Sequence, residues 1–194
     1  ISNNSKSKGL KFGKIFKIKK KIFNFQKSYI AEKKILNALK KNKITLVCLA
    51  GFMKILSKNF IKKFKGKILN IHPGIIPTTR GLDSFKWAIY NLNPLGITLH
   101  YIDVTVDSGE VLRIFETPIY RSDTLQTLAR RHYENEIYVS SNFYKFFFYL
   151  NLYRVVAFFD ILEVNLFCSR PPRSEYSHLT QSFLKCLTHL ENGF

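Results

Sequence analysis

Acidic residues and cysteines are scarce in this sequence of 194 residues. Only 13 Asp and Glu oppose 31 Lys and Arg, which gives a formal net charge of +18. The three cysteines, Cys48, Cys168 and Cys186, form neither a Cys-x-x-Cys pair nor a Cys/His cluster with metal-ligand spacing. We therefore expect no metal site, and so sparse a set of cysteines favours a reducing, cytoplasmic setting.

A long uncharged apolar run is also lacking. The most apolar stretch, 143–168, contains four charged residues, and that density argues against a membrane-spanning helix, so we interpret it as a buried or unplaced helix. The amino-terminal end is polar and basic and shows no signal peptide. With 46% hydrophobic residues, the chain has enough apolar material for one globular domain with a real core.

The positive charge has two interpretations. A basic chain can bind nucleic acid or an anionic membrane. However, the basic residues are spread along the chain and are mostly lysine, and the densest run, 11–21, has no arginine. We favour lysine-rich solvated faces and expect no specific nucleic-acid or membrane partner, although a positive field would attract small anionic substrates.

Helical and strand-like patterns alternate along the first 149 residues. This order predicts an α/β fold: a mostly parallel sheet flanked by helices, with an antiparallel strand added late. From Leu150 onward the pattern degrades, so we divide the chain into a domain over 1–149 and an unassigned tail over 150–194. Helices are expected at 8–16, 28–41, 57–64, 83–92 and 123–138, the last capped by Ser122 or Asp123 with Gln126, and strands at 20–25, 44–50, 67–71, 96–102 and 110–119.

The segment 67–77 contains the most informative residues. Its strand ends on Asn70 and His72, which lie two residues apart and so project from the same face. Open α/β sheets bind ligands past the carboxyl ends of their strands. A carboxamide and an imidazole held there can stabilise an oxyanion and move a proton.

A carboxylate beside the imidazole would favour its cationic form. The loop that contains Asp103 and Asp107 offers candidates. Taken singly, each residue also has a structural interpretation, with His72 ending a strand and Asp107 forming a turn with Gly109.

Three stretches together resemble the formyltransferase family that uses 10-formyltetrahydrofolate. They are LAGFMKILS at 49–57, NIHPGIIP at 70–77 and GITLHYIDVTVDSG at 96–109, in that order. The resemblance covers 1–149 and implies a Rossmann-like formyltransferase fold. The family's opening strand and its Gly/Ser-rich phosphate loop have no counterpart, since Ile1–Asn3 is similar to the family's second strand. The implied reaction is transfer of a formyl group to an amine, with glycinamide ribonucleotide of purine biosynthesis as the leading acceptor.

The resemblance also implies roles for individual residues. Asn70, His72 and Asp107 match the catalytic residues. The folate co-substrate would lie against Met53, Lys54, Ile55, Leu56, Ile102, Asp103 and Val106, and the acceptor against His100, Pro73, Gly74 and Glu134.

The sequence does not decide which amine is the acceptor. Gly74 stands where the purine enzymes usually carry Ser, and the stretch from Arg80 to Trp87 is more similar to formyltransferases that act on amino sugars or on charged initiator tRNA. An N-formyltransferase for the sugar amine of a nucleotide-sugar and an inactive fragment are therefore the alternatives.

Overall fold

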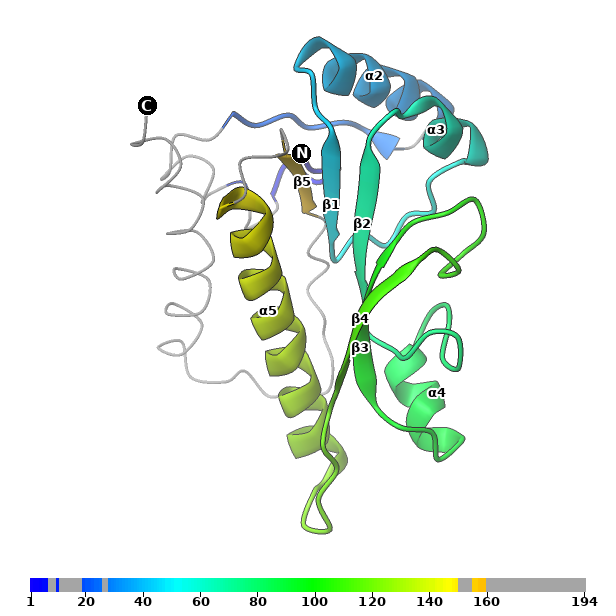
Figure 1. The fold of residues 1–194 in the computed structure, drawn as a ribbon, viewed down its shortest axis with the longest axis vertical. Coiled ribbons are helices and arrows are strands. Elements are labelled where there is room, and N and C mark those ends of the chain that lie inside the picture. Colours follow the sequence, from blue (N-terminus) through cyan, green and yellow to red (C-terminus); the bar gives the residue numbers. More distant parts are fainter. Residues whose placement is uncertain (7–9, 11–18, 26–27, 150–154, 160–194) are drawn as a thin grey trace.

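The computed structural model describes residues 1–6, 10, 19–25, 28–149 and 155–159, which form one sheet with helices packed around it (Figure 1). Its helices are α2 (Ser28–Lys41), α3 (Lys58–Lys63), α4 (Ser84–Tyr90) and α5 (Leu125–Tyr149), and its strands are β1 (Leu46–Ala50), β2 (Lys67–His72), β3 (Gly96–Tyr101), β4 (Val111–Glu116) and β5 (Val155–Phe159).

The sheet has the order β4-β3-β2-β1-β5. Strand β1 pairs in parallel with both β2 and β5, whereas β3 is antiparallel to its neighbours β2 and β4. One strand thus runs against the other four, and the predicted α/β fold with a mostly parallel sheet and a late antiparallel strand is confirmed.

Strand β1 shows why its sequence is a continuous apolar run. Leu46 and Cys48 belong to a core cluster that includes Val139 of α5, while Val47 and Leu49 belong to a second cluster with Ile35 of α2. Alternate side chains point to opposite faces, and both faces are covered by helices, so every position must be apolar.

The amino-terminal part of the described chain adds a short pairing to this frame. Ser2 bridges Ile22 in parallel, with Ser2 N donating to Lys21 O and Phe23 N donating to Ser2 O, each at 3.0 Å. The expected strand at 20–25 is thus reduced to one bridge, and the expected helix at 8–16 lies almost entirely outside the described residues.

Helix α5 begins differently from the prediction. Thr124 and Thr127 cap it reciprocally, because each backbone N–H donates to the hydroxyl of the other. Asp123 instead accepts two hydrogen bonds from Arg131, each 2.6 Å long. The prediction that Ser122 or Asp123 caps the helix is therefore wrong, because Thr124 takes this position and the Asp123 carboxylate is held by an arginine two turns into the helix.

The helix expected over 143–168 is also only partly correct. Residues 143–149 continue α5, but Val155–Phe159 form β5 and pair with the edge of β1. A strand fits there because the backbone groups on that side of β1 need hydrogen-bond partners. Among the described helices, none combines the length and apolar character needed to cross a bilayer.

Candidate active site

The candidate site lies at the carboxyl end of β2, where two polar side chains face the antiparallel strand β3. Asn70 is opposite His100 in the register, and His72 is opposite Thr98. The amide Nδ2 of Asn70 lies 3.1 Å from Nε2 of His100. The pairing of β2 with β3 therefore joins two side chains that are thirty residues apart in the sequence.

His100 is held as a neutral imidazole by its surroundings. Its Nδ1 donates to the carbonyl oxygen of Tyr101 at 2.9 Å, which leaves Nε2 to accept from Asn70. Burial lowers the pKa of His100, and this outweighs the raising effects of the Tyr101 carbonyl and the Asp107 charge. The neutral ring thereby fixes the Asn70 amide group, whose nitrogen still carries a second hydrogen.

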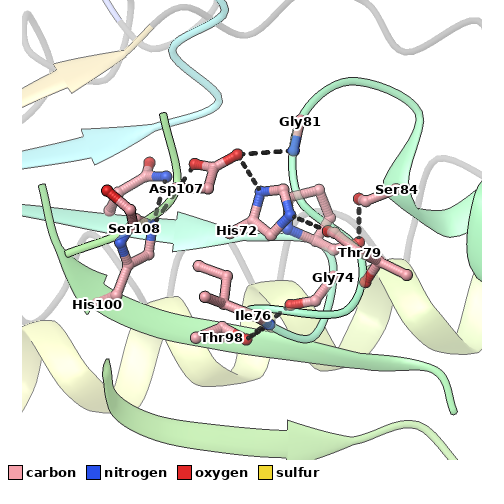
Figure 2. Close-up of polar contacts among 12 residues, drawn as sticks. His72, Gly74, Ile76, Thr79, Gly81, Ser84, Thr98, His100, Asp107 and Ser108 are labelled. Carbon is pink, nitrogen blue, oxygen red and sulfur yellow. Dashed lines mark hydrogen bonds and ion pairs between the residues drawn. The ribbon is translucent and has the colours of Figure 1, made fainter. Parts of the chain in front are cut away.

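His72 lies between two hydrogen-bond acceptors (Figure 2). Its Nε2 is 2.7 Å from the carbonyl oxygen of Thr79, and its Nδ1 is 3.5 Å from Oδ2 of Asp107. A carbonyl and a carboxylate can only accept, so the ring donates to both sides only when both of its nitrogens are protonated. The geometry therefore suits an imidazolium held against a carboxylate.

Asp107 is positioned by its own backbone and by the loop after β2. Its φ is 47°, a left-handed conformation that turns the chain sharply at this point. Its Oδ2 accepts from Gly81 N at 2.9 Å, and its Oδ1 lies 3.8 Å from Nε2 of His100 (Figure 2). With its side chain 13% exposed, the carboxylate faces both histidines and keeps some access to water.

Hydroxyl groups fix the loop that follows His72 (Figure 2). Thr98 Oγ1 donates to Gly74 O at 2.7 Å and accepts from Ile76 N at 3.1 Å, and Ser84 donates to Pro73 O at 2.5 Å. The Ile76–Pro77 peptide bond is cis.

The structure gives a steric reason for glycine at position 74. A Cβ there would lie 2.6 Å from the carbonyl oxygen of Thr79 and 2.8 Å from Cβ of Ser84. The same Thr79 oxygen accepts from His72. The compact turn that orients His72 thus has no room for a larger residue at Gly74.

The expected folate-binding residues divide into two groups. Leu56 is buried in the core cluster on the α2 face of the sheet, and Ile102 packs against that cluster. Met53, Ile55 and Val106 instead expose 51%, 78% and 54% of their surface. The apolar residues of this set are thus partly buried and partly exposed, while Lys54 and Asp103 are exposed.

Glu134 occupies a different environment from the other expected site residues. It lies on α5 with about half of its side chain exposed and accepts from Nε of Arg130 at 2.9 Å. No described contact joins it to Asn70, His72 or Asp107, and its role in acceptor binding stays a prediction.

Sequence reasoning missed His132, which holds the same loop from the other side. This buried residue of α5 places Nε2 3.3 Å from Pro73 O and Nδ1 3.0 Å from Thr117 Oγ1. Burial lowers its pKa, since the raising effect of the Pro73 carbonyl is smaller. One signal was available: His132 has helical spacing with Leu128 and Val139, which are also buried.

Comparison with known proteins places this site in a family. Residues 1–141 match the family described as "Formyl transferase". The chain therefore belongs to the formyl transferase family. Within it, phosphoribosylglycinamide formyltransferase of Haemophilus influenzae is 34% identical over 140 residues, which cover 70% of this chain and 66% of that protein.

Two further matches agree with this assignment. The trifunctional purine biosynthetic protein adenosine-3 of Chironomus tentans is 41% identical over 96 residues, 49% of this chain and 7% of that protein. The crystal structure of phosphoribosylglycinamide formyltransferase from Streptococcus pneumoniae superposes with a TM-score of 0.66 at 28% identity, covering 75% of this chain and 83% of that one. The chain thus spans less than a tenth of the trifunctional relative and about two thirds of the Haemophilus protein.

Proposed function

We propose that this protein transfers the formyl group of 10-formyltetrahydrofolate to the amine of glycinamide ribonucleotide. The observation that carries the proposal is the grouping of Asn70, His72, His100 and Asp107 at the carboxyl end of β2 in a formyl transferase chain. The names of the similar proteins support this acceptor. The substrates are small molecules, and a cytoplasmic setting remains a prediction.

Asn70 is the proposed oxyanion donor. When the acceptor amine attacks the formyl carbon, a new C–N bond forms and negative charge develops on the formyl oxygen. One N–H of Asn70 is used by His100, and the second can donate to that oxygen. A donor that is already oriented stabilises the charge without reorganising during the reaction.

His72 and Asp107 are the proposed charge and proton-transfer pair. Nε2 of His72 is occupied by Thr79, so His72 contributes to oxyanion stabilisation here through charge, when both of its ring nitrogens carry a proton, and not through a direct hydrogen bond. Asp107 accepts the proton that the attacking amine loses, and the proton passes on to the folate nitrogen as its bond to the formyl carbon breaks. The partial exposure of Asp107 suits a relay through water.

The exposed apolar side chains suit the folate co-substrate. The donor supplies a formyl group on a nitrogen leaving group, attached to a flat heterocycle. Met53, Ile55 and Val106 would lose contact with water against such a ring, which is favourable. This fit supports the folate assignment independently of the acceptor.

A transfer assay tests the proposal. Purified protein is given both substrates, and the folate product is followed by absorbance. Removal of the carboxylate in Asp107→Asn should lower kcat/KM about 10²- to 10⁴-fold, because a general acid–base group contributes about that much. His72→Ala should show a comparable loss.

The matched control is Glu110→Gln, which removes one negative charge from an exposed residue just before β4. It should retain full activity. Equal activity of Asp107→Asn and the unchanged protein would refute the assignment of the site.

An amino sugar of a nucleotide-sugar is the second candidate acceptor. Arg80 is exposed, forms no ion pair with a described residue, and precedes the Gly81 N–H that binds Asp107. Trp87, one turn into α4, is 55% exposed. An exposed cation next to Gly81 and an exposed indole on α4 suit a phosphate and a base. Formylation of a nucleotide-linked sugar amine but not of glycinamide ribonucleotide would favour this acceptor.

A further inference from the structure

A second feature lies away from the candidate active site, on the side of α2. A hollow of about 330 Å³ opens between α2 and residues 21–23. Helix α2 leads directly into the start of β1, whereas the candidate site lies where β2 ends, and Figure 1 shows α2 at the opposite end of the sheet from α4. A ligand here would not occupy the space beside His72.

Three lysines surround this hollow: Lys21 on the bridging segment, and Lys34 and Lys41 on α2. The two helical lysines are seven residues apart and so lie on the same face of α2, about 10 Å apart along its axis. None of the three side chains forms an ion pair or hydrogen bond with a described residue. Their charges therefore converge on one opening without neutralisation.

Helix α2 provides no acid that could neutralise them. Its one acidic residue, Glu32, is buried and accepts from both the backbone N–H and the hydroxyl of Ser57, which caps α3. That carboxylate holds two helices together and is unavailable to the hollow. A general excess of lysine explains the number of charges but not their convergence around an apolar depression.

The floor of the hollow is apolar and anchored. Ile22, Phe23 and Ala38 line it between the lysines. The segment is held in place because buried Ser2 pairs with the backbone of Lys21 and Phe23. Phe23 also packs against the core cluster on this face of the sheet.

We propose that this hollow binds a phosphorylated small molecule that carries at least two negative charges and a flat apolar ring. Lys21, Lys34 and Lys41 contact the phosphates, Asn37 adds an amide hydrogen bond, and the ring covers Ile22, Phe23 and Ala38. The size of the hollow is at the lower end of the range for ligand pockets, about 300–1,000 Å³. The site is independent of the formyl-transfer proposal.

Calorimetric titration of the whole protein tests the inference with two probes. Adenosine 5′-diphosphate carries phosphates and a ring, whereas pyrophosphate carries only the charge. The diphosphate nucleotide should bind saturably with one molecule per chain, and more tightly than pyrophosphate. The double variant K34E/K41E should weaken both by about tenfold or more, since it reverses two charge-assisted contacts.

The matched control is K58E/K62E on α3, which changes the net charge by the same amount at two exposed lysines. It should change either affinity less than about threefold, because neither lysine lines the hollow and charges exposed to water are screened by salt. Ala38→Phe should weaken the nucleotide while leaving pyrophosphate binding nearly unchanged, because it fills the space for the ring.

Lysine acetylation read by mass spectrometry locates the bound molecule. Lys21, Lys34 and Lys41 should be protected by the nucleotide, and Lys58 and Lys62 should not. Equal losses in the two double variants, absence of saturable binding, or protection elsewhere would overturn the proposal. So would binding of single-stranded RNA in strong preference to the nucleotide with a steep salt dependence, which would indicate a nucleic-acid surface instead.

Discussion

The candidate site and the hollow beside α2 handle polar groups in opposite ways. At the carboxyl end of β2, the buried histidines His72 and His100 each have partners on both ring nitrogens. Beside α2, Lys34 and Lys41 extend into water, where solvent satisfies them. A buried polar group that loses its partner is costly, whereas an exposed charge is not.

This contrast indicates how each region depends on the rest of the fold. The first requires β2, β3, the loop 73–81 and the loop of Asp107 to be in register at once, so a change at one residue alters its neighbours. The second requires only a helix face and an anchored segment. We expect substitutions in the first to affect both stability and activity, and lysine substitutions in the second to affect ligand binding alone.

Among the variants that compare the two regions directly, the largest effect is expected at Asn70. Asn70→Asp keeps the shape of the side chain but cannot donate to Nε2 of His100 or to an oxyanion. Loss of one preorganised donor should lower kcat/KM about 10²- to 10³-fold. The measurement is the formyl-transfer assay, with Lys34→Ala from the hollow as the comparison.

The two variants should separate clearly. Lys34→Ala should leave kcat/KM unchanged and alter stability by less than about 0.5 kcal/mol, as is usual for surface positions. Full activity of Asn70→Asp would mean that Asn70 contributes only its shape. It would refute the idea that the candidate site depends on its hydrogen bonds more than the hollow does.

A smaller effect is expected from Gly74→Ala. The added Cβ would meet the Thr79 carbonyl at 2.6 Å, so Thr79 must move and with it the acceptor of His72. Such overpacking should lower the free energy of unfolding by about 1–3 kcal/mol. Denaturant unfolding measures this loss, and Ala38→Leu on the lining of the hollow should change stability far less. Equal stability of the two variants would show that the loop yields easily.

Much of the site could be predicted from sequence because strand geometry is local. The two-residue spacing of Asn70 and His72 and the strand end at Pro73 place both side chains at the carboxyl end of β2. The structure confirms that His72 and Asp107 come together. Their catalytic roles remain predictions.

Other features depend on contacts that the sequence pattern does not encode. Thr124 caps α5 because Arg131 holds Asp123, and this requires the folded helix. The sequence around strand β5 has no clear periodicity, so the pattern does not predict this strand, which is defined by its pairing with β1. His132 meets Pro73 across 59 positions of sequence, a separation that no local pattern reports.

The smallest effect concerns Glu136, an acidic residue whose side chain differs from the buried histidines of the candidate site. It lies half-buried on α5, and its carboxylate forms no hydrogen bond or ion pair with another described residue. Burial raises its pKa to about 7 from 4.5, so the folded protein binds a proton that the unfolded chain has already released. The contribution of Glu136 to the free energy of unfolding is therefore fully present below about pH 4.5 and is lost as the pH rises toward 7. Glu136→Gln should match the unchanged protein in stability at pH 4 and exceed it by about 1–2 kcal/mol at pH 8, a discounted share of that shift. Urea unfolding at the two pH values measures the difference in stability between Glu136→Gln and the unchanged protein. The control is Glu134→Gln, at an exposed residue paired with an arginine, and it should show no such gain. A stability difference that stays constant across pH would mean that Glu136 does not titrate in this range.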